Sequence, residues 1–188
     1  MNKYLKVSLT LATIASGSAL LIGLMNLATV NAIKTNKENT IKNGISKLYP
    51  TLSSYVAHDF LAKDDENYDM QYDADTYPHL KSVYVVTYGD NLDTGYVYST
   101  TGKNAYGQVD LLISVNDYKV DEIYVVTNTE SYGPTLEDNY IDLYNYGLLE
   151  NGLSDVKCGA TYGAKTVKEE CDDALRHWTN FFVEKEAN

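Results

Sequence analysis

A turn of small residues at positions 155–166, DVKCGATYGAKT, carries one side chain with clear chemical potential, the hydroxyl of Thr161. Gly159, Ala160 and Gly163 let the backbone come close to a bound group, because none of them has a bulky side chain. A helical pattern follows directly, and the unpaired N–H groups and partial positive charge at a helix N-terminus stabilise an anion. These residue types predict a phosphate site at which the Thr161 hydroxyl contacts the phosphate or is esterified to it.

The helix that positions this turn is predicted from Ala164 almost to the C-terminus. Its apolar residues recur at steps of three and four and so form one face: Val167, Cys171, Ala174, Leu175, Trp178, Phe181 and Phe182. We expect Cys171 in the core and both cysteines as free thiols, because Cys171 lies too far along the helix for the roughly 7 Å that a disulfide spans. His177 is expected to be exposed. The alternative for the turn is an ordinary helix start with Thr161 as its N-cap.

The centre of the chain is predicted to form an antiparallel sheet. Short runs of β-branched and aromatic residues, separated by turn residues, lie at 82–88, 94–99, 108–115 and 120–127. The last two runs are interpreted as a hairpin that turns at residues 116–118, and a short helix is predicted within residues 136–149. Together with the C-terminal helix, this pattern predicts an α+β fold.

The N-terminal region contains no charged residue between Lys6 and Lys34. The apolar run at residues 7–33 is longer than the about 20 residues that a membrane-spanning helix requires. A cleaved signal peptide is the alternative, since residues 30–32 have small side chains at the spacing of a cleavage site, but such peptides have a shorter apolar region of roughly 7 to 15 residues. We therefore favour a retained anchor, whose helix continues as a polar stalk and ends near Pro50.

The composition argues against several classes of function. The 188 residues include 26 acidic and 15 basic ones and 18 tyrosines, and nucleic acid is not an expected partner because phosphate backbones are bound by basic surfaces. The three histidines have no metal-ligand spacing, and the acidic run at residues 64–69 lacks the pattern of a calcium loop. No Gly-x-Gly-x-x-Gly follows a predicted strand, so we expect no NAD site.

Residues 155–161 resemble Asp-x-x-Ser/Thr-Gly-Ala-Thr, the flavinylation signature of the FMN-binding domain family that includes the RnfG and NqrC subunits. The chain departs from this signature at Cys158, where Ser or Thr is usual and makes the stronger hydrogen bond. Residues 104–107 and 130–133 occupy the places of the family's Gly-Tyr-Gly-Gly and Glu-Thr-Pro-Gly turns. The second turn departs from the family pattern at Tyr132, where proline is usual.

This resemblance implies a cofactor and a role for the turn. In the family a separate flavin transferase, with FAD as donor, attaches FMN to the final threonine through a phosphoester, and that residue corresponds to Thr161. The further cofactor-binding residues that the resemblance implies are Asp155, Cys158, Gly159, Ala160, Glu130 and Tyr132. No catalytic residue is expected, because the flavin carries the chemistry while the protein supplies attachment, orientation and tuning.

The resemblance also implies a location and partners. Members of this type have one N-terminal span and an extracytoplasmic flavin domain, and the length of this chain is more similar to RnfG than to NqrC. We therefore expect an electron-transfer subunit of an ion-translocating ferredoxin:NAD oxidoreductase (Rnf) complex, with other membrane subunits as partners. The alternatives are a free-standing FMN protein of the cell envelope for extracellular electron transfer, or a non-catalytic surface binding module.

The predicted domain organisation follows from these patterns. Residues 1–34 are expected to form the transmembrane anchor, residues 35–80 a stalk and variable lead-in, and residues 81–188 the FMN-binding domain. Lysines lie on both sides of the span, so positive charge does not choose the side of the membrane on which the domain lies.

Overall fold

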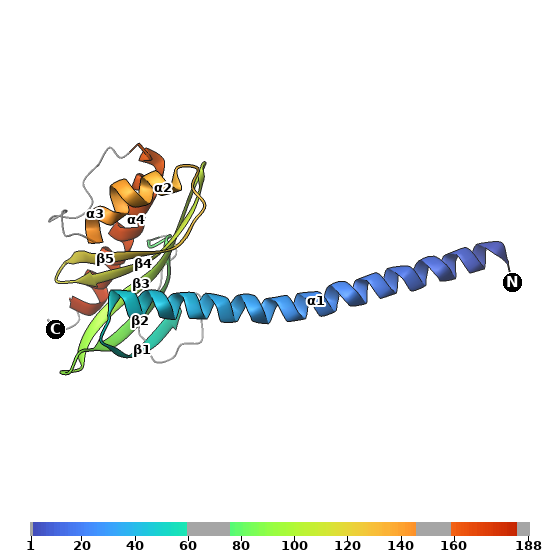
Figure 1. Cartoon of the computed structure of the whole chain (residues 1–188), viewed down its shortest axis with the longest axis horizontal. Coiled ribbons are helices and arrows are strands. Elements are labelled where there is room, and N and C mark those ends of the chain that lie inside the picture. The colour runs from blue at the N-terminus through green and yellow to red at the C-terminus, as the bar shows by residue number, and fades with distance from the viewer. Residues whose placement is uncertain (1, 60–75, 146–158, 184–188) are drawn as a thin grey trace. The chain divides into compact units, whose positions relative to one another are not determined.

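The structure, a computed structural model, describes residues 2–59, 76–145 and 159–183. The chain divides into two compact units, Met1–Thr40 and Ile41–Asn188. The second unit has an α+β fold in which one antiparallel sheet is flanked by helices (Figure 1). The predicted α+β class, with an antiparallel sheet and a C-terminal helix, is therefore confirmed.

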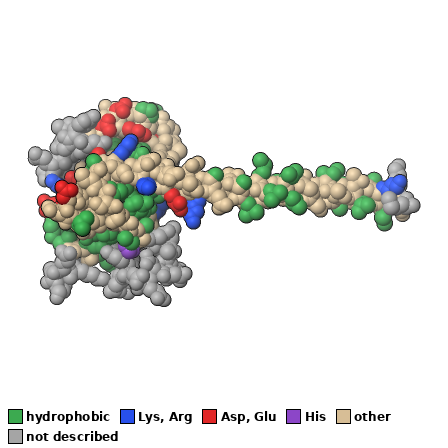
Figure 2. Space-filling model, turned by 60° about the horizontal axis from the view of Figure 1, so that its bottom comes forward, with side chains coloured by type: hydrophobic (Ala, Val, Ile, Leu, Met, Phe, Trp, Pro, Cys, Tyr) green, Lys and Arg blue, Asp and Glu red, His purple; other side chains and the backbone are tan. Residues whose placement is uncertain are grey.

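The first helix, α1 (Lys3–Leu48), is long and apolar enough to cross a membrane. Its 46 residues span about 69 Å at 1.5 Å per residue, more than the roughly 30 Å of a bilayer's hydrocarbon core. Hydrophobic side chains lie on several sides of the helix (Figure 2). The hydroxyls of Thr10, Thr13 and Thr29 each donate to the carbonyl four residues earlier, which satisfies them without water. The helix ends two residues before Pro50, as predicted.

The sheet is a five-stranded antiparallel meander with strands in the order β1-β2-β3-β4-β5. The strands are β1 (Leu52–Asp59), β2 (Leu80–Tyr88), β3 (Asp93–Asn104), β4 (Gly107–Asn116) and β5 (Lys119–Asn128). The four strands predicted from the sequence correspond to β2–β5. Strand β1 was not predicted: it pairs only with β2, and its LSSYVAHD sequence lacks a clear alternation of apolar and polar residues.

The turn between β4 and β5 lies where the sequence predicts it. Asp117 and Tyr118 have φ values of 49° and 59°, so both central residues of this two-residue loop are left-handed, as a type I′ hairpin requires. Asn116 pairs with Lys119 across the loop, and the register of the two strands shifts by one residue between Ser114 and Val115. An aspartate suits such a turn, but a tyrosine is an uncommon choice there.

Helices pack on both faces of the sheet. Alternate residues of β4 point to opposite sides: Leu111 and Ile113 belong to the core beneath α4 (Thr161–Trp178), whereas Leu112 belongs to the core beneath residues 41–48 of α1. The α4 side also contains the short helical run of α2 (Gly133–Leu136), η1 (Glu137–Ile141) and α3 (Asp142–Asn145). This run confirms a helix within residues 136–149, of which residues 146–149 lie outside the described part.

The inner face of α4 matches the predicted apolar pattern, with one correction. Val167, Cys171 and Ala174 are buried, and Cys171 is a free thiol as predicted. The prediction that His177 is exposed is wrong, because its side chain is fully buried and its Nδ1 lies 3.0 Å from the Tyr98 hydroxyl. Burial lowers the pKa of His177 to about 4, so the imidazole is neutral at physiological pH.

Candidate functional site

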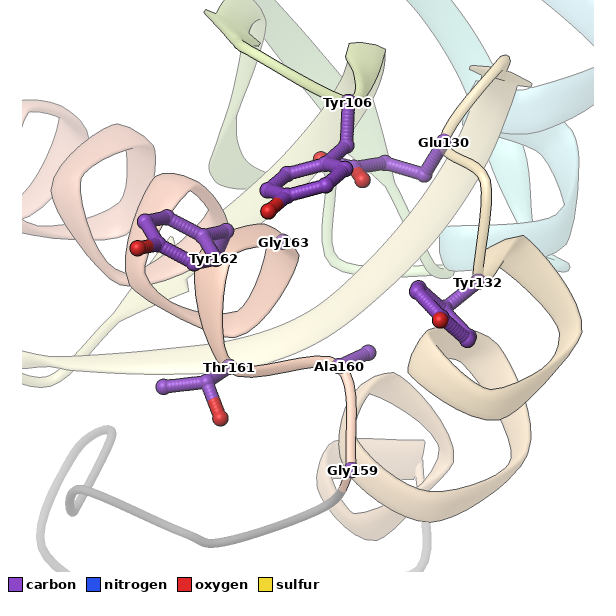
Figure 3. A pocket seen from close by; sticks show the side chains of 8 residues that line it. All are labelled: Tyr106, Glu130, Tyr132, Gly159, Ala160, Thr161, Tyr162 and Gly163. Carbon is purple, nitrogen blue, oxygen red and sulfur yellow. The ribbon is translucent and has the colours of Figure 1, made fainter.

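An open cavity of about 270 Å³ lies at the N-terminal end of α4. Its walls come from three segments that are far apart in the sequence: the β3–β4 turn, the segment after β5 and the start of α4 (Figure 3). The lining residues are Tyr106, Glu130, Tyr132 and residues 159–163. The fold therefore brings together five of the seven predicted cofactor-binding residues, Thr161, Gly159, Ala160, Glu130 and Tyr132, whereas Cys158 and Asp155 lie outside the described residues.

The backbone before α4 has the conformation that the small residues allow. Gly159 has a φ of +83°, in the left-handed region that favours glycine. Ala160 is the N-cap of α4 and provides no side-chain cap. The helix begins at Thr161, three residues earlier than the apolar pattern indicates, so the N-cap is Ala160 and the prediction of Thr161 as N-cap is wrong.

Thr161 presents a free hydroxyl at the cavity. The side chain is exposed, and within the described part of the chain its hydroxyl makes no hydrogen bond. The first intrahelical bond runs from the Ala164 N–H to the Ala160 carbonyl at 2.9 Å, so the N–H groups of residues 161–163 precede the helical ladder. The start of α4 thus offers an unused hydroxyl beside N–H groups that can bind an anion.

Glu130 is held in place by one hydrogen bond to its side chain and one from its backbone. The side-chain amide of Asn104 donates to Glu130 Oε1 and also to Thr166 Oγ1, at 2.9 Å in the second case. The Thr166 hydroxyl in turn donates to the carbonyl of Tyr162 at 3.0 Å, and the backbone N–H of Glu130 donates to Asn128 Oδ1 at 3.0 Å. Asn104 therefore ties β3, the segment after β5 and α4 together behind the cavity.

Two glycines let these segments approach each other. A Cβ on Gly163 would lie 2.8 Å from Leu136 Cδ2, so a side chain there would push α4 away from α2. A Cβ on Gly107 would lie 2.5 Å from the carbonyl oxygen of Thr129 and 2.6 Å from Glu130 Cα. Because the atoms next to Gly107 belong to backbone, they cannot move aside as a flexible side chain would.

Gly107→Ala should therefore destabilise the domain and displace Glu130 from the cavity. We expect the free energy of unfolding to fall by about 1–3 kcal/mol, the usual cost of inserting atoms into a well-packed site. Urea denaturation followed by tryptophan fluorescence measures this change. Lys103→Ala, at an exposed position on the same hairpin, is the matched control and should leave the unfolding midpoint unchanged; equal midpoints for the two variants would contradict the close approach.

Tyrosine rings form much of the cavity wall. The rings of Tyr106 and Tyr162 lie 5.1 Å apart between centroids with an interplanar angle of 44°. Figure 3 shows these two rings on one side of the cavity and Tyr132 on the other. Tyr106 and Tyr162 lie in the highlighted segments 104–107 and 155–166, but neither was predicted to bind the cofactor, since residue type alone gives no reason to select them among 18 tyrosines. Their position next to the glycines of two turns was the available signal.

A buried carboxyl group lies on the same face of α4, one turn beyond Thr166. The Glu170 side chain is fully buried; the Thr100 hydroxyl donates to its Oε2, and its Oε1 has no partner among the described residues. Gly102 makes room for it, because a Cβ there would lie 2.4 Å from Oε1. Burial raises the pKa of Glu170 to about 8, so the carboxyl is protonated at neutral pH.

The other acidic groups near α4 are paired rather than gathered into a metal site. Asp173 is buried and contacts the imidazole Nδ1 of His79 at 2.8 Å and the guanidinium of Arg176 at 2.6 Å. In the described ranges, no group of three or more His, Cys, Asp and Glu side chains is arranged to hold a metal ion.

No protein-family model matches the chain, and a search of curated proteins found no match either.

Proposed function

We propose that this protein is a membrane-anchored flavoprotein that carries FMN as a phosphoester on Thr161 and relays electrons. The observation that supports this function best is the position of Thr161, an exposed residue whose hydroxyl makes no hydrogen bond to another described residue, at an open cavity that tyrosines and Glu130 also line. The sequence around it resembles the flavinylation signature described above. FMN, when bound, supplies the electron transfer, and the protein attaches and orients it.

The residues at the start of α4 suit a phosphoester. The N–H groups of residues 161–163 and the partial positive charge of the helix end stabilise phosphate oxygens. Gly159 and Ala160, the two residues before Thr161, line the same cavity and have no bulky side chains of their own. This oxygen would form the new bond to phosphorus and lose its proton, while the pyrophosphate bond of an FAD donor breaks and AMP leaves.

The cavity suits a ring system with a polar tail. Its volume of about 270 Å³ is just below the roughly 300–1,000 Å³ of typical ligand pockets, and its open side leaves room for a chain leading to Thr161. The tyrosine rings provide flat walls, and Glu130, held by Asn104, provides a hydrogen-bond acceptor for a ring N–H group.

Helix α1 supports the membrane part of the proposal. By its length and apolar composition it can serve as the single anchor, and we propose that the flavin domain lies on the extracytoplasmic side. We further propose that the protein is a subunit of an Rnf-type complex with other membrane subunits as partners. Co-purification of multi-span subunits with the detergent-extracted protein supports the complex, whereas a solitary monomer favours the free-standing envelope flavoprotein.

A denaturing gel tests the proposed function. The full chain, co-expressed with a flavin transferase and extracted with detergent, should give a fluorescent band at its own mass that survives acid precipitation, because only a covalent flavin remains after unfolding. An established transferase substrate in a parallel culture serves as the positive control. A dark band beside a fluorescent control would overturn the proposal.

A further inference from the structure

The paired rings of Tyr106 and Tyr162 are placed unlike the tyrosines of the core. They come from separate elements, the β3–β4 turn and the first turn of α4, and yet their centroids are 5.1 Å apart. Their side chains remain 45% and 60% exposed, so the contact between them buries only part of either ring. Both line the cavity next to Thr161. The pair therefore presents aromatic surface to the cavity in addition to packing against itself.

We propose that Tyr106 and Tyr162 form an aromatic wall that binds the planar ring system of the ligand, an isoalloxazine-type fused heterocycle. The inference deepens the proposed function and rests on it for the identity of that ring. Aromatic side chains contribute large flat surfaces at low conformational cost, and they hold a planar ligand by offset or edge contacts. Stacking of this kind contributes affinity for any planar ring. Glu130 contributes a hydrogen-bond acceptor that orients the ring in the cavity.

The backbone fixes the wall relative to the attachment residue. Tyr162 follows Thr161 directly in α4, and the Thr166 hydroxyl, which is bonded to the Tyr162 carbonyl, holds this first helical turn. Tyr106 is held on the other side, because its backbone N–H donates to Asn104 Oδ1 at 2.8 Å and its carbonyl accepts from the Ser131 N–H at 3.2 Å. Both backbones are thus positioned without a ligand, and little ordering is needed when a ring binds.

The wall is tested with a probe that needs no covalent attachment. The full-length Thr161→Val chain, purified in detergent, is titrated with riboflavin, which has the ring system but no phosphate. Adding Tyr162→Leu should weaken riboflavin binding about tenfold, because the stacking surface is lost. Tyr106→Leu in the same background should weaken it similarly, and Tyr162→Phe, which keeps the ring, should bind as tightly as the parent.

Tyr118→Leu is the matched control, since Tyr118 is also 60% exposed but lies in the β4–β5 turn outside the cavity. Its riboflavin affinity should equal that of the parent. The inference is overturned if the parent does not bind riboflavin, if Tyr162→Leu binds as tightly as Tyr162→Phe, or if Tyr118→Leu shows the same loss. Covalent FMN on the wild-type chain is measured in a separate experiment. A failure of the proposed ring binding by Tyr106 and Tyr162 is therefore distinguished from a failure of the proposed flavin attachment.

Discussion

The Thr161→Val variant should carry no covalent flavin when it is co-expressed with a flavin transferase, whereas the wild type carries one. Valine has nearly the shape of threonine but lacks the hydroxyl oxygen, so no phosphoester can form. The substitution should not unfold the protein, because the Thr161 side chain is exposed and its hydroxyl makes no hydrogen bond within the described residues. In-gel fluorescence measures the flavin, and circular dichroism verifies the fold.

Two further variants locate the attachment. Cys158→Ser restores the residue type that is usual in the flavinylation signature, and it should retain the flavin at the wild-type level or above. Thr161→Ser keeps a hydroxyl at the start of α4 and should retain some labelling. Covalent flavin on Thr161→Val would show that another residue is the attachment site. Flavin that persists on Thr161→Val and is lost when Cys158→Ser is added would assign a thiol linkage at Cys158.

Glu170 should make the stability of the domain fall as the pH rises towards 8. Its pKa is raised from 4.5 to about 8 in the folded protein, so between these values the folded state holds a proton that the unfolded state has released. The stabilisation that Glu170 contributes is fully present below pH 4.5. Between pH 4.5 and about 8, the free energy of unfolding falls by about 1.4 kcal/mol per pH unit. Above about pH 8 the folded carboxyl also ionises and the loss ends.

His177 opposes this trend in the lower part of the window. Its pKa is lowered from 6.5 to about 4, so between these values the unfolded state binds the extra proton and stability rises with pH. The two contributions nearly cancel between about pH 4.5 and 6.5, and the Glu170 contribution alone remains from there to about pH 8. The wild-type protein should therefore have nearly constant stability up to pH 6.5 and lose stability above it.

Glu170→Gln separates the two groups, because glutamine mimics the protonated acid and does not titrate. Urea denaturation at several pH values should show that this variant gains stability relative to the wild type from about pH 4.5 to about 8, because His177 titrates alike in both proteins. Glu169→Gln, which changes an exposed neighbour on the same helix, should follow the wild-type curve. Parallel curves for Glu170→Gln and the wild type would show that Glu170 does not carry a raised pKa.

Periodic patterns predicted most of the regular structure. The alternation in residues 108–115 and 120–127 gave β4, β5 and their turn, and the steps of three and four gave the inner face of α4. Edge strand β1 was missed because its sequence has a weak pattern, whereas β5, the other edge strand, has a clear run of β-branched and aromatic residues. His177 was placed at the surface because residue type suggests solvent, whereas its position on the apolar face of α4 places it in the core.

The candidate site was predictable only in part. The turn at residues 159–163 combines small residues with a helix start, and both features can be predicted from the local sequence. The contributions of Tyr106, Tyr162 and Glu170 depend on how β3 meets α4, and no local pattern encodes that contact. Gly102 and Gly107 both lie in segments that the sequence predicts as turns, and their role in close packing becomes visible only in three dimensions.

Intact mass spectrometry of the detergent-extracted chain tests the central claim most directly. With a flavin transferase present, the wild-type protein should gain the mass of one FMN less one water, and peptide fragmentation should place this mass on Thr161. Without the transferase, and in Thr161→Val with it, the mass should be that of the unmodified chain. An unmodified wild-type mass in cells whose transferase labels another substrate, or an FMN adduct on a residue other than Thr161, would contradict the account.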